Sequence, residues 1–532
     1  MLNELIFFLQ NALFKSEYFF DFWSHNSIYY STIKYSKKKL SISKKINSQV
    51  CVIGSGVGGL AAAARLAARG MQVSVFEKND AYGGKVSPIR TNGYLWGFGA
   101  SLFTLPELLD ELFVSCRQSP SDYYNYTQID PICRYLFPDG TIINAFAQPD
   151  LFAAEVASKT GEPGAHILSF LKEAERKYEL TKDIFLFHSL HKFSTYTNRK
   201  AIHSLFNLSS LGILKKMNTV NENSFSDTRI VQLFNRYATY NGSNPYVAPS
   251  TLNVIAHLEY NKGAYYLQGG MPALTQSLYQ LCLDLGVKFT FNAMVNAIHI
   301  TDNRVTGINV GNINCPADVV VSNMDIVYTY RNLMPELPEP KRFLTGEKSS
   351  SAIIFYWGIK DTFSNLELHN ILFSGNYKAE FDCITNKKIV YDDPTIYIYI
   401  SSKMDKAHAP EGCENWFVMV NAPHDSGQDW SQIITEARKN ILKKLKIEAG
   451  LDIESLISCE IVNHPGTIQE KTLSHLGALY GNSSNTILSA FLRHPNFSQS
   501  IKGLYFSGGS VHPGGGVPLC LLSAKIVDEL VD

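Results

Sequence analysis

The fold is decided by the stretch Val50-Cys51-Val52-Ile53-Gly54-Ser55-Gly56-Val57-Gly58-Gly59-Leu60-Ala61-Ala62-Ala63-Ala64. A short apolar run leads into glycines spaced G-x-G-x-x-G, and an alanine-rich helical pattern follows. Gly54 permits a tight turn, Gly56 lets the backbone approach a pyrophosphate, and Gly59 lets the helix pack closely on the strand. The pattern predicts a strand, a phosphate-binding turn that includes Gly58, and a helix whose N-terminus faces the phosphates.

The residues that follow complete this pattern. The helix is expected to run to about Arg69, where Gly70 suits the left-handed position that follows a helix. A second strand over 73–76 ends in Glu77, 23 positions after Gly54. An acidic residue about 20 positions after the glycines accepts hydrogen bonds from the ribose hydroxyls of an adenosine. This order of elements predicts a dinucleotide site, and the alternative is a glycine-rich turn without a ligand.

A second motif follows directly, in Glu77-Lys78-Asn79-Asp80-Ala81-Tyr82-Gly83-Gly84-Lys85. It resembles the E-x(5)-G-G-R/K motif of the large FAD-binding family that includes amine oxidases and phytoene desaturases. The resemblance implies FAD rather than NAD, with Lys78, Gly83, Gly84 and Lys85 beside the cofactor. Lys85 stands where arginine is common in that family, so a point charge replaces a planar, two-pronged donor.

A later stretch is expected to return the chain to the cofactor. It begins at Gly269-Gly270-Met271-Pro272 and continues with a helical pattern as far as Leu285. Strand-like runs follow over 287–290, 295–300, 305–310 and 319–323. By resemblance, Val295 falls where the family contacts adenine through main-chain atoms.

The C-terminus supplies a third piece, Gly503-Leu504-Tyr505-Phe506-Ser507-Gly508-Gly509-Ser510-Val511-His512-Pro513-Gly514-Gly515-Gly516-Val517-Pro518. A helix is expected over 519–531. The glycines let the backbone reach a flavin, and the helix N-terminus favours negative charge on a reduced flavin. The cofactor contacts predicted in this stretch are Gly508, Gly509, His512, Gly514, Gly516, Val517 and Pro518.

Together, these motifs resemble the phytoene-desaturase-like family of FAD-dependent oxidoreductases, the bacterial carotenoid desaturases. The resemblance covers about 49–532 and implies an α/β fold. A Rossmann-like FAD-binding domain would be built from the discontinuous segments 49–104, 263–335 and 499–532. An α+β substrate domain with a mixed sheet and helices would be built from 105–262 and 336–498. Residues 1–48 would form a leader, either disordered or interfacial with a membrane.

The resemblance implies an enzyme that introduces C=C bonds into a long polyene during carotenoid biosynthesis, with oxygen or a quinone as electron acceptor. The run 412–423 is most similar to the branch of 1-hydroxycarotenoid 3,4-desaturases. Two alternatives stay open. One is a flavin-dependent carotene cis–trans isomerase, which causes no net oxidation, and the other is a non-catalytic carotenoid-binding flavoprotein.

No catalytic base is evident from the sequence. Arg236, Tyr240 and His369 are candidates for polar side chains in the substrate pocket, and a structural role is the alternative for each of them. The stretch 94–101 departs from the family, because Gly97 stands in place of an aspartate and Ala100 in place of a proline. We expect that departure to alter turnover rather than FAD binding.

Composition narrows the partners. Basic and acidic residues number 48 each, so the chain has no net charge with which to gather nucleic acid. Nine cysteines are scattered without a C-x-x-C pair, which favours reduced thiols. The histidines lack the spacing of metal ligands, so no metal is predicted.

A carotenoid substrate implies contact with a membrane surface. No stretch is apolar enough to span a bilayer. Residues 1–35 are crowded with aromatic side chains and lysines follow over 34–45, which fits an interfacial anchor or an unstructured leader. The stretch 189–217 is a second candidate for membrane docking, with an ordinary amphipathic helical region as the alternative. The protein is expected to be cytoplasmic and peripherally membrane-associated.

Overall fold

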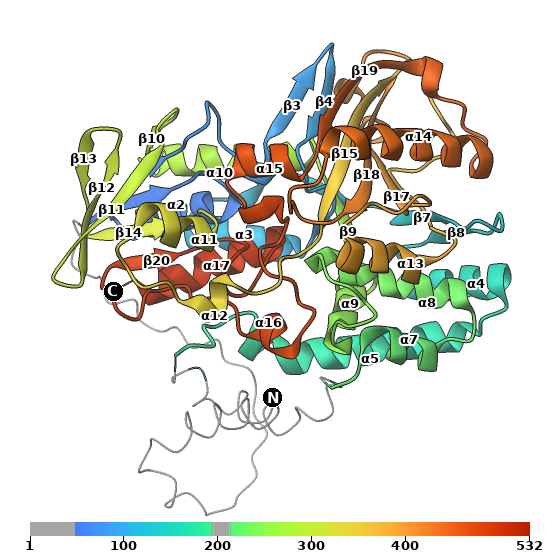
Figure 1. Ribbon diagram of the computed structural model, residues 1–532, viewed down its shortest axis with the longest axis horizontal. Helices are drawn as coiled ribbons and strands as arrows, with labels where there is room; N and C mark the ends of the chain where they lie inside the picture. Colours follow the sequence, from blue (N-terminus) through green and yellow to red (C-terminus); the bar gives the residue numbers. More distant parts are fainter. Residues whose placement is uncertain (1–47, 193–194, 196–211, 213, 532) are drawn as a thin grey trace, which may run out of the picture.

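The computed structural model describes residues 48–192, 195, 212 and 214–531. A parallel sheet with its helices lies at the left of Figure 1, and a larger mixed sheet lies at the upper right, above a group of helices. Most of the segments expected to dock on a membrane, 1–48 and 189–217, lie outside the described residues. Among the helices that are described, none is both long and apolar enough to cross a bilayer.

The parallel sheet has the strand order β10-β2-β1-β14-β20. Its central strand β1 (Gln49–Ile53) lies between β2 (Gln72–Phe76) and β14 (Val319–Ser322), with β10 (Lys288–Thr290) and β20 (Leu504–Phe506) at the edges. All four pairings are parallel. Strands from three distant parts of the chain therefore form one sheet, and the discontinuous, Rossmann-like α/β fold is confirmed.

Four helices share one apolar core with this sheet: α2 (Val57–Ala68), α3 (Pro106–Ser115), α10 (Met271–Asp284) and α17 (Val517–Leu530). The alanines at 61–64 of α2 are fully buried, so small side chains let it pack closely between α10 and α17. Gly70 follows α2 with a φ of 90°, as its position after a helix requires. The last helix begins two residues earlier than expected, because Pro518 belongs to its first turn.

An antiparallel meander lies in sequence between β10 and β14 of the parallel sheet. It consists of β11 (Val295–Thr301), β12 (Arg304–Val310) and β13 (Ile313–Pro316). The first two strands agree with the runs expected at 295–300 and 305–310. They are joined at Asp302 and Asn303, whose φ angles of 50° and 57° suit these residue types in a tight turn.

The larger sheet has seven strands in the order β19-β15-β18-β17-β16-β7-β8. Every neighbouring pair is antiparallel except β16 and β7, which makes the sheet mixed. One face packs on α14 (Trp430–Glu448) through a core that includes Trp357, Trp416 and Leu445. Its strands are β7 (Cys133–Leu136), β8 (Ile142–Ala145), β15 (Ser351–Ile359), β16 (His369–Leu372), β17 (Ile396–Ile400), β18 (Glu414–Ala422) and β19 (Ile457–Asn463).

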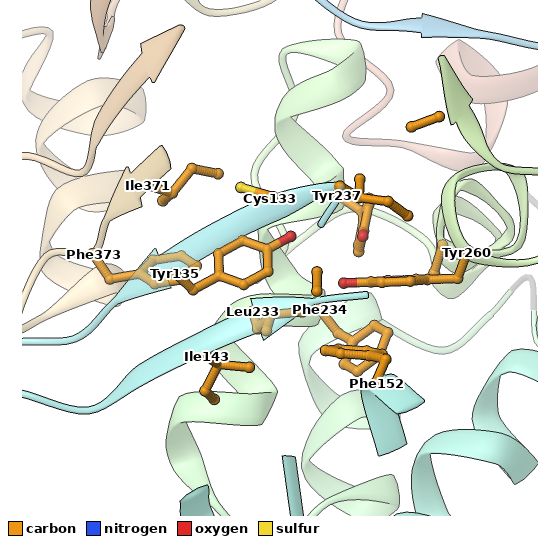
Figure 2. Close-up of a cluster of buried hydrophobic side chains, with 14 of the residues drawn as sticks. Cys133, Tyr135, Ile143, Phe152, Leu233, Phe234, Tyr237, Tyr260, Ile371 and Phe373 are labelled. Atoms are coloured by element: carbon orange, nitrogen blue, oxygen red, sulfur yellow. The ribbon is translucent and has the colours of Figure 1, made fainter. Parts of the chain in front are cut away.

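The opposite face of this sheet meets a helical group, α4 (Pro149–Thr160), α5 (Gly164–Phe185), α7 (Met217–Ser224), α8 (Thr228–Asn235) and α9 (Val254–Tyr260). Aromatic rings fill the space between them. Figure 2 shows this cluster, in which Phe152 stacks on Tyr260 with ring centroids 4.5 Å apart. The substrate side therefore has a mixed sheet and helices, as expected.

The remaining strands and helices are short. They are β3 (Pro88–Thr91), β4 (Tyr94–Gly97), β5 (Phe103–Thr104), β6 (Tyr126–Gln128), β9 (Ala264–Leu267), α11 (Ile326–Tyr328), α12 (Lys341–Leu344), α13 (Tyr377–Asp382), α15 (Pro465–Thr472) and α16 (Ile487–Phe491). Core packing does not follow one boundary at 104. Trp96 packs in the core of the larger sheet, whereas Leu109 of α3 packs in the core of the parallel sheet. The exact domain limits stay a prediction.

Candidate active site

A continuous cavity joins the two halves of the molecule. At one end it is lined by the glycine turns at the carboxyl ends of the parallel strands. At the other end it is lined by side chains of β7, β15, β16, β17 and β18 and by residues near 236–240. The carboxyl edge of a parallel sheet is where doubly wound folds bind nucleotides. The cavity thus connects a nucleotide site with a chamber beside the mixed sheet.

The glycine turn after β1 is shaped for close approach. A Cβ atom at Gly56 would lie 2.8 Å from Oδ1 of Asn323, and one at Gly58 would lie 2.8 Å from its Nδ2. A Cβ atom at Gly59 would lie 2.1 Å from the carbonyl oxygen of Gly54, so this glycine permits helix–strand packing and does not line the cavity. The α2 helix begins without a side-chain cap, which leaves its first amides for a ligand.

Glu77 lies at the end of β2, next to this turn. Its Oε2 accepts hydrogen bonds from the backbone N–H and the hydroxyl of Ser55, both at 2.8 Å. Its Oε1 accepts from the backbone and side-chain amides of Asn79, at 3.0 and 2.8 Å. The carboxylate lines the cavity while its position is fixed from four directions. Lys78 and Val295 also line the cavity, and the contacts of these three residues with the cofactor stay a prediction.

The second glycine pair packs against the first. Gly83 forms a β-bridge with Gly56, and a Cβ atom at Gly84 would lie 3.3 Å from the Cα atom of Gly56. Lys85 follows, and its Nζ donates to the carbonyl oxygen of Leu479 at 2.7 Å. Burial lowers the pKa of Lys85, and nearby Asp325 opposes that shift. The lysine thus links the cofactor end of the cavity to the segment that leads into the C-terminal motif.

The C-terminal motif divides into two groups. Residues that line the cavity are Gly508, Gly509, Gly516, Val517 and Pro518, while Gly514 and His512 do not line it. His512 is fully buried, and its Nε2–H donates to the carbonyl oxygen of His188 at 3.0 Å. Burial lowers the pKa of His512 to about 3, so its ring is neutral. The geometry gives His512 a supporting position behind the cofactor turn, and its predicted contact with the cofactor stays a prediction.

Sequence reasoning missed several cavity residues that follow β14. Asn323, Met324 and Asp325 line the cavity, and Nδ2 of Asn323 donates to the carbonyl oxygen of Ser507 at 2.9 Å. This contact ties the carboxyl end of β14 to the C-terminal motif. The signal that could have found them is positional, because they directly follow a central strand of a parallel sheet. Ser510, Gly515 and Cys520 were also missed.

The three pocket candidates all line the cavity beyond the cofactor end. Arg236 forms a buried ion pair with Glu259, with 3.1 Å between Nη2 and Oε1. Its Nη1 donates to the hydroxyl of Tyr240 at 3.2 Å, and that hydroxyl donates to Oε2 of Glu259. The environment of carboxylate and phenols raises the pKa of Arg236 despite the burial, so the guanidinium stays charged.

His369 belongs to a separate chain of hydrogen bonds. Its Nδ1 lies 2.7 Å from the hydroxyl of Tyr397, which donates to Oγ of Ser101 at 2.8 Å. Because the tyrosine hydrogen is given to Ser101, Nδ1 of His369 is the donor to Tyr397. Burial, together with nearby Arg236, lowers the pKa of His369 to about 3. Ala100 and Ser101 both line the cavity. They lie in the stretch 94–101, which departs from the family pattern, so part of that stretch borders the cavity.

Among the residues that the structure describes, no three His, Cys, Asp or Glu side chains are grouped to hold a metal ion. All nine cysteines, each within the described chain, carry free thiols. The groups at the cofactor end of the cavity fit a dinucleotide. They are the uncapped amides at a helix N-terminus, a carboxylate held in place by hydrogen bonds, and glycines beside which a Cβ atom would occupy the space.

Fold and site together define an FAD-dependent oxidoreductase. The chain belongs to the family of flavin containing amine oxidoreductases, whose model matches residues 57–527. FAD would be held by Glu77 at its ribose and by the turns at 54–58, 83–85 and 508–518 along its pyrophosphate and flavin. The resemblance to phytoene-desaturase-like proteins is confirmed by the relatives described next.

The chain is 48% identical to the 1-hydroxycarotenoid 3,4-desaturase of Flavobacterium sp. (strain P99-3), over 90% of this chain and 98% of that protein. It is 31% identical to a 4,4'-diapolycopene oxygenase of Methylomonas sp., over 91% of this chain and 98% of that protein. It is 30% identical to a phytoene desaturase of Fusarium fujikuroi, over 91% and 89%. A solved putrescine oxidase variant shares the fold, with a TM-score of 0.60 and 13% identity, over 91% of this chain and 98% of that one.

Proposed function

We propose that the protein is an FAD-dependent carotenoid desaturase that acts on a hydroxylated carotenoid. The observation that carries this proposal is the continuous cavity, in which the cofactor turns lead into a chamber beside the mixed sheet. Apolar side chains form much of its wall, namely Leu102, Ile132, Ala352, Ile354, Ile371, Met419 and Leu479. The 48% identical relative is itself a 1-hydroxycarotenoid 3,4-desaturase, which supports the substrate class.

Desaturation removes two hydrogens from neighbouring carbons, one as a hydride and one as a proton, and leaves a C=C bond. FAD supplies the hydride acceptor when it is bound. The protein orients one C–C bond toward it and excludes water, which the apolar walls around Ile132, Ile354 and Ile371 can do. The proton is released, and oxygen or a quinone takes the two electrons in a later step.

The chamber walls suit a polyene for a physical reason. A carotenoid offers extended apolar surface and few polar groups, so burial of that surface is the main source of its binding energy. A water-insoluble substrate also has to be taken from a membrane. We therefore propose that the protein docks peripherally on a bilayer, with residues 1–48 and 189–217 as the proposed docking segments.

The test is a reductive half-reaction. The purified holoprotein is mixed without oxygen with a 1-hydroxycarotenoid in liposomes, and the flavin absorbance and product mass are followed. We expect the flavin band to bleach, and we expect a product lighter by about two mass units for each C=C bond, since two hydrogens leave per bond. Admission of oxygen or addition of a quinone then identifies the acceptor by the return of the band.

Two results would contradict the proposal. A product of unchanged mass with altered retention, formed while the flavin stays oxidised, would indicate a cis–trans isomerase. A flavin that no carotenoid reduces, in a protein that still binds carotenoid, would indicate a non-catalytic carotenoid-binding flavoprotein. Flotation of the protein with liposomes tests membrane docking independently of both.

A further inference from the structure

One group of polar side chains interrupts the apolar part of the cavity. It consists of Arg236, Glu259, Tyr135, Tyr237 and Tyr240, and is called the Arg236 cluster below. Arg236 and Glu259 are only 7% and 1% exposed, yet both line the cavity together with Tyr240. The five residues of the cluster come from three separate elements: β7, the turn at 236–241 and α9.

The cluster is tightly connected. Arg236 Nη2 donates to the hydroxyl of Tyr135 at 2.7 Å and to Glu259 at 3.1 Å. The hydroxyl of Tyr237 donates to the same Glu259 oxygen at 2.8 Å. The guanidinium carbon lies 4.4 Å from the ring centroid of Tyr237 and 5.4 Å from that of Tyr240. Figure 2 shows Tyr135 and Tyr237, two tyrosines of this cluster, among the buried aromatic side chains.

The Arg236–Glu259 ion pair makes this part of the cavity unfavourable for binding a pure hydrocarbon. Tyr135 is surrounded by Cys133, Ile371 and Phe373, whose ring stacks on it at 5.8 Å. Ile132, Cys133 and Ile371 also line the cavity. A hydrocarbon placed there would remove water from the ion pair and return no hydrogen bond, which carries a desolvation penalty. A ligand with a hydroxyl group at this point avoids that penalty.

The cluster also keeps unused hydrogen-bonding capacity. A guanidinium has five N–H donors. Three are engaged by Tyr135, Tyr240 and Glu259, while Nε finds no acceptor among the described residues. Glu259 Oε2 receives one hydrogen bond, from Tyr240, and a carboxylate oxygen can accept two. An alcohol can accept from the guanidinium and donate to the carboxylate at once.

We infer that the Arg236 cluster binds the hydroxyl group of a hydroxylated polyene and thereby fixes which C–C bond lies against the cofactor. This inference rests on the proposed function and names the residues that read the substrate. Arg236, Glu259 and Tyr240 line the same cavity as the glycine turns of the cofactor end.

The test compares two substrates in three proteins. The substrates are a 1-hydroxycarotenoid and the same polyene without the hydroxyl group. The proteins are the wild type, Tyr240→Phe, and the control Tyr124→Phe. The control removes a comparable tyrosine–carboxylate hydrogen bond, to Asp110 at 2.7 Å, outside the cavity lining. The readout is kcat/KM for each substrate, taken from anaerobic flavin reduction.

We expect Tyr240→Phe to lower kcat/KM for the hydroxylated substrate by about tenfold more than for the other substrate, the usual loss of one hydrogen bond next to a charged group. Tyr124→Phe should leave kcat/KM unchanged for both substrates. An equal loss on both substrates would overturn the inference and leave the proposed function standing. If the wild type oxidises neither polyene, the proposed function fails first. Should Tyr240→Phe not fold, Tyr135→Phe gives the same comparison, because it removes another hydroxyl of the cluster.

Discussion

The Oε2 atom of Glu77 accepts two hydrogen bonds from Ser55, one from the backbone N–H and one from the hydroxyl, and each is 2.8 Å long. Ser55 lies inside the glycine turn, and Glu77 ends the neighbouring strand 22 residues later. The two halves of the predicted nucleotide motif are therefore bonded directly to each other. The carboxylate that would receive the ribose also stabilises the turn that would receive the phosphates.

This double role predicts a loss of FAD in Glu77→Gln. The amide keeps the shape but loses the charge and one acceptor, so it opposes the N–H donors that now meet the carboxylate. We expect FAD affinity to fall by about tenfold to a hundredfold, since hydrogen bonds to charged groups contribute about 1.5–3 kcal/mol. The measurement is titration of the apoprotein with FAD. Ser55→Ala keeps the backbone bond and should lose less, and full affinity in Glu77→Gln would refute the assignment.

Gly56 provides a purely steric test. Its φ of −70° suits any residue, so alanine adds no backbone strain there. The new methyl group would nevertheless lie 2.8 Å from Asn323 Oδ1, in the turn that would hold the pyrophosphate of FAD. We expect Gly56→Ala to retain about a tenth or less of the FAD affinity, because overpacking costs about 1–3 kcal/mol. The matched control is Gly97→Ala, whose methyl would meet Pro272 at an ordinary 3.4 Å and should leave the FAD content unchanged.

The parallel sheet could be predicted from sequence because its information is local. Three of its five strands, β1, β2 and β20, lead into motifs typical of dinucleotide sites, so Gly54, Glu77 and Gly508 mark their own positions in the fold. Both main departures concern packing rather than motif. Trp96 and Leu109 join cores opposite to the expected ones, because an apolar side chain carries no signal of which core it enters.

The chamber could be predicted only in part. The structure places Arg236, Tyr240 and His369 along the cavity, as expected of pocket residues. Their partners Glu259, Tyr135 and Tyr397 were not foreseen, since these come from α9, β7 and β17 and share no motif with them. A buried ion pair is formed by long-range topology. One sequence shows the charges but not which of them meet.

Glu380 gives a prediction about how the stability of the protein changes from acidic to neutral pH. It is 1% exposed, and burial raises its pKa to about 7 although Thr395 donates two hydrogen bonds to it. Between pH 4.5 and 7 the folded state therefore binds more protons than the unfolded state, so this group makes stability fall as the pH rises. Glu380→Gln cannot ionise, and we expect it to gain up to about 3 kcal/mol relative to wild type between pH 5 and pH 8.

The check is urea unfolding of both proteins at the two pH values. The exposed Glu436 on α14 offers a control, because Glu436→Gln removes a carboxyl group from the surface of the protein. If the difference between Glu380→Gln and wild type were the same at pH 5 and pH 8, Glu380 would titrate alike in the folded and unfolded states.

The buried histidines predict the opposite dependence in acid. Burial lowers the pKa of His512 and of His369 to about 3 and that of His494 to about 4. A histidine whose pKa is lowered by folding contributes stability above its unfolded value near 6.5, and this stability is lost as the pH falls toward the folded value. Each such group can cost up to about 1.4 kcal/mol of stability per pH unit in that window.

We expect His512→Gln to lose the hydrogen bond to His188 at every pH. Its stability should nevertheless fall less steeply than that of the wild type between pH 6 and pH 4. At pH 8 the ring is neutral in both states, so the difference in unfolding free energy between the two proteins measures the lost contacts alone. The further change in that difference at lower pH measures the effect of protonating His512. Parallel curves for the two proteins would mean that His512 takes up its proton without unfolding, and the turn behind the cofactor would then have to open to solvent in the native state.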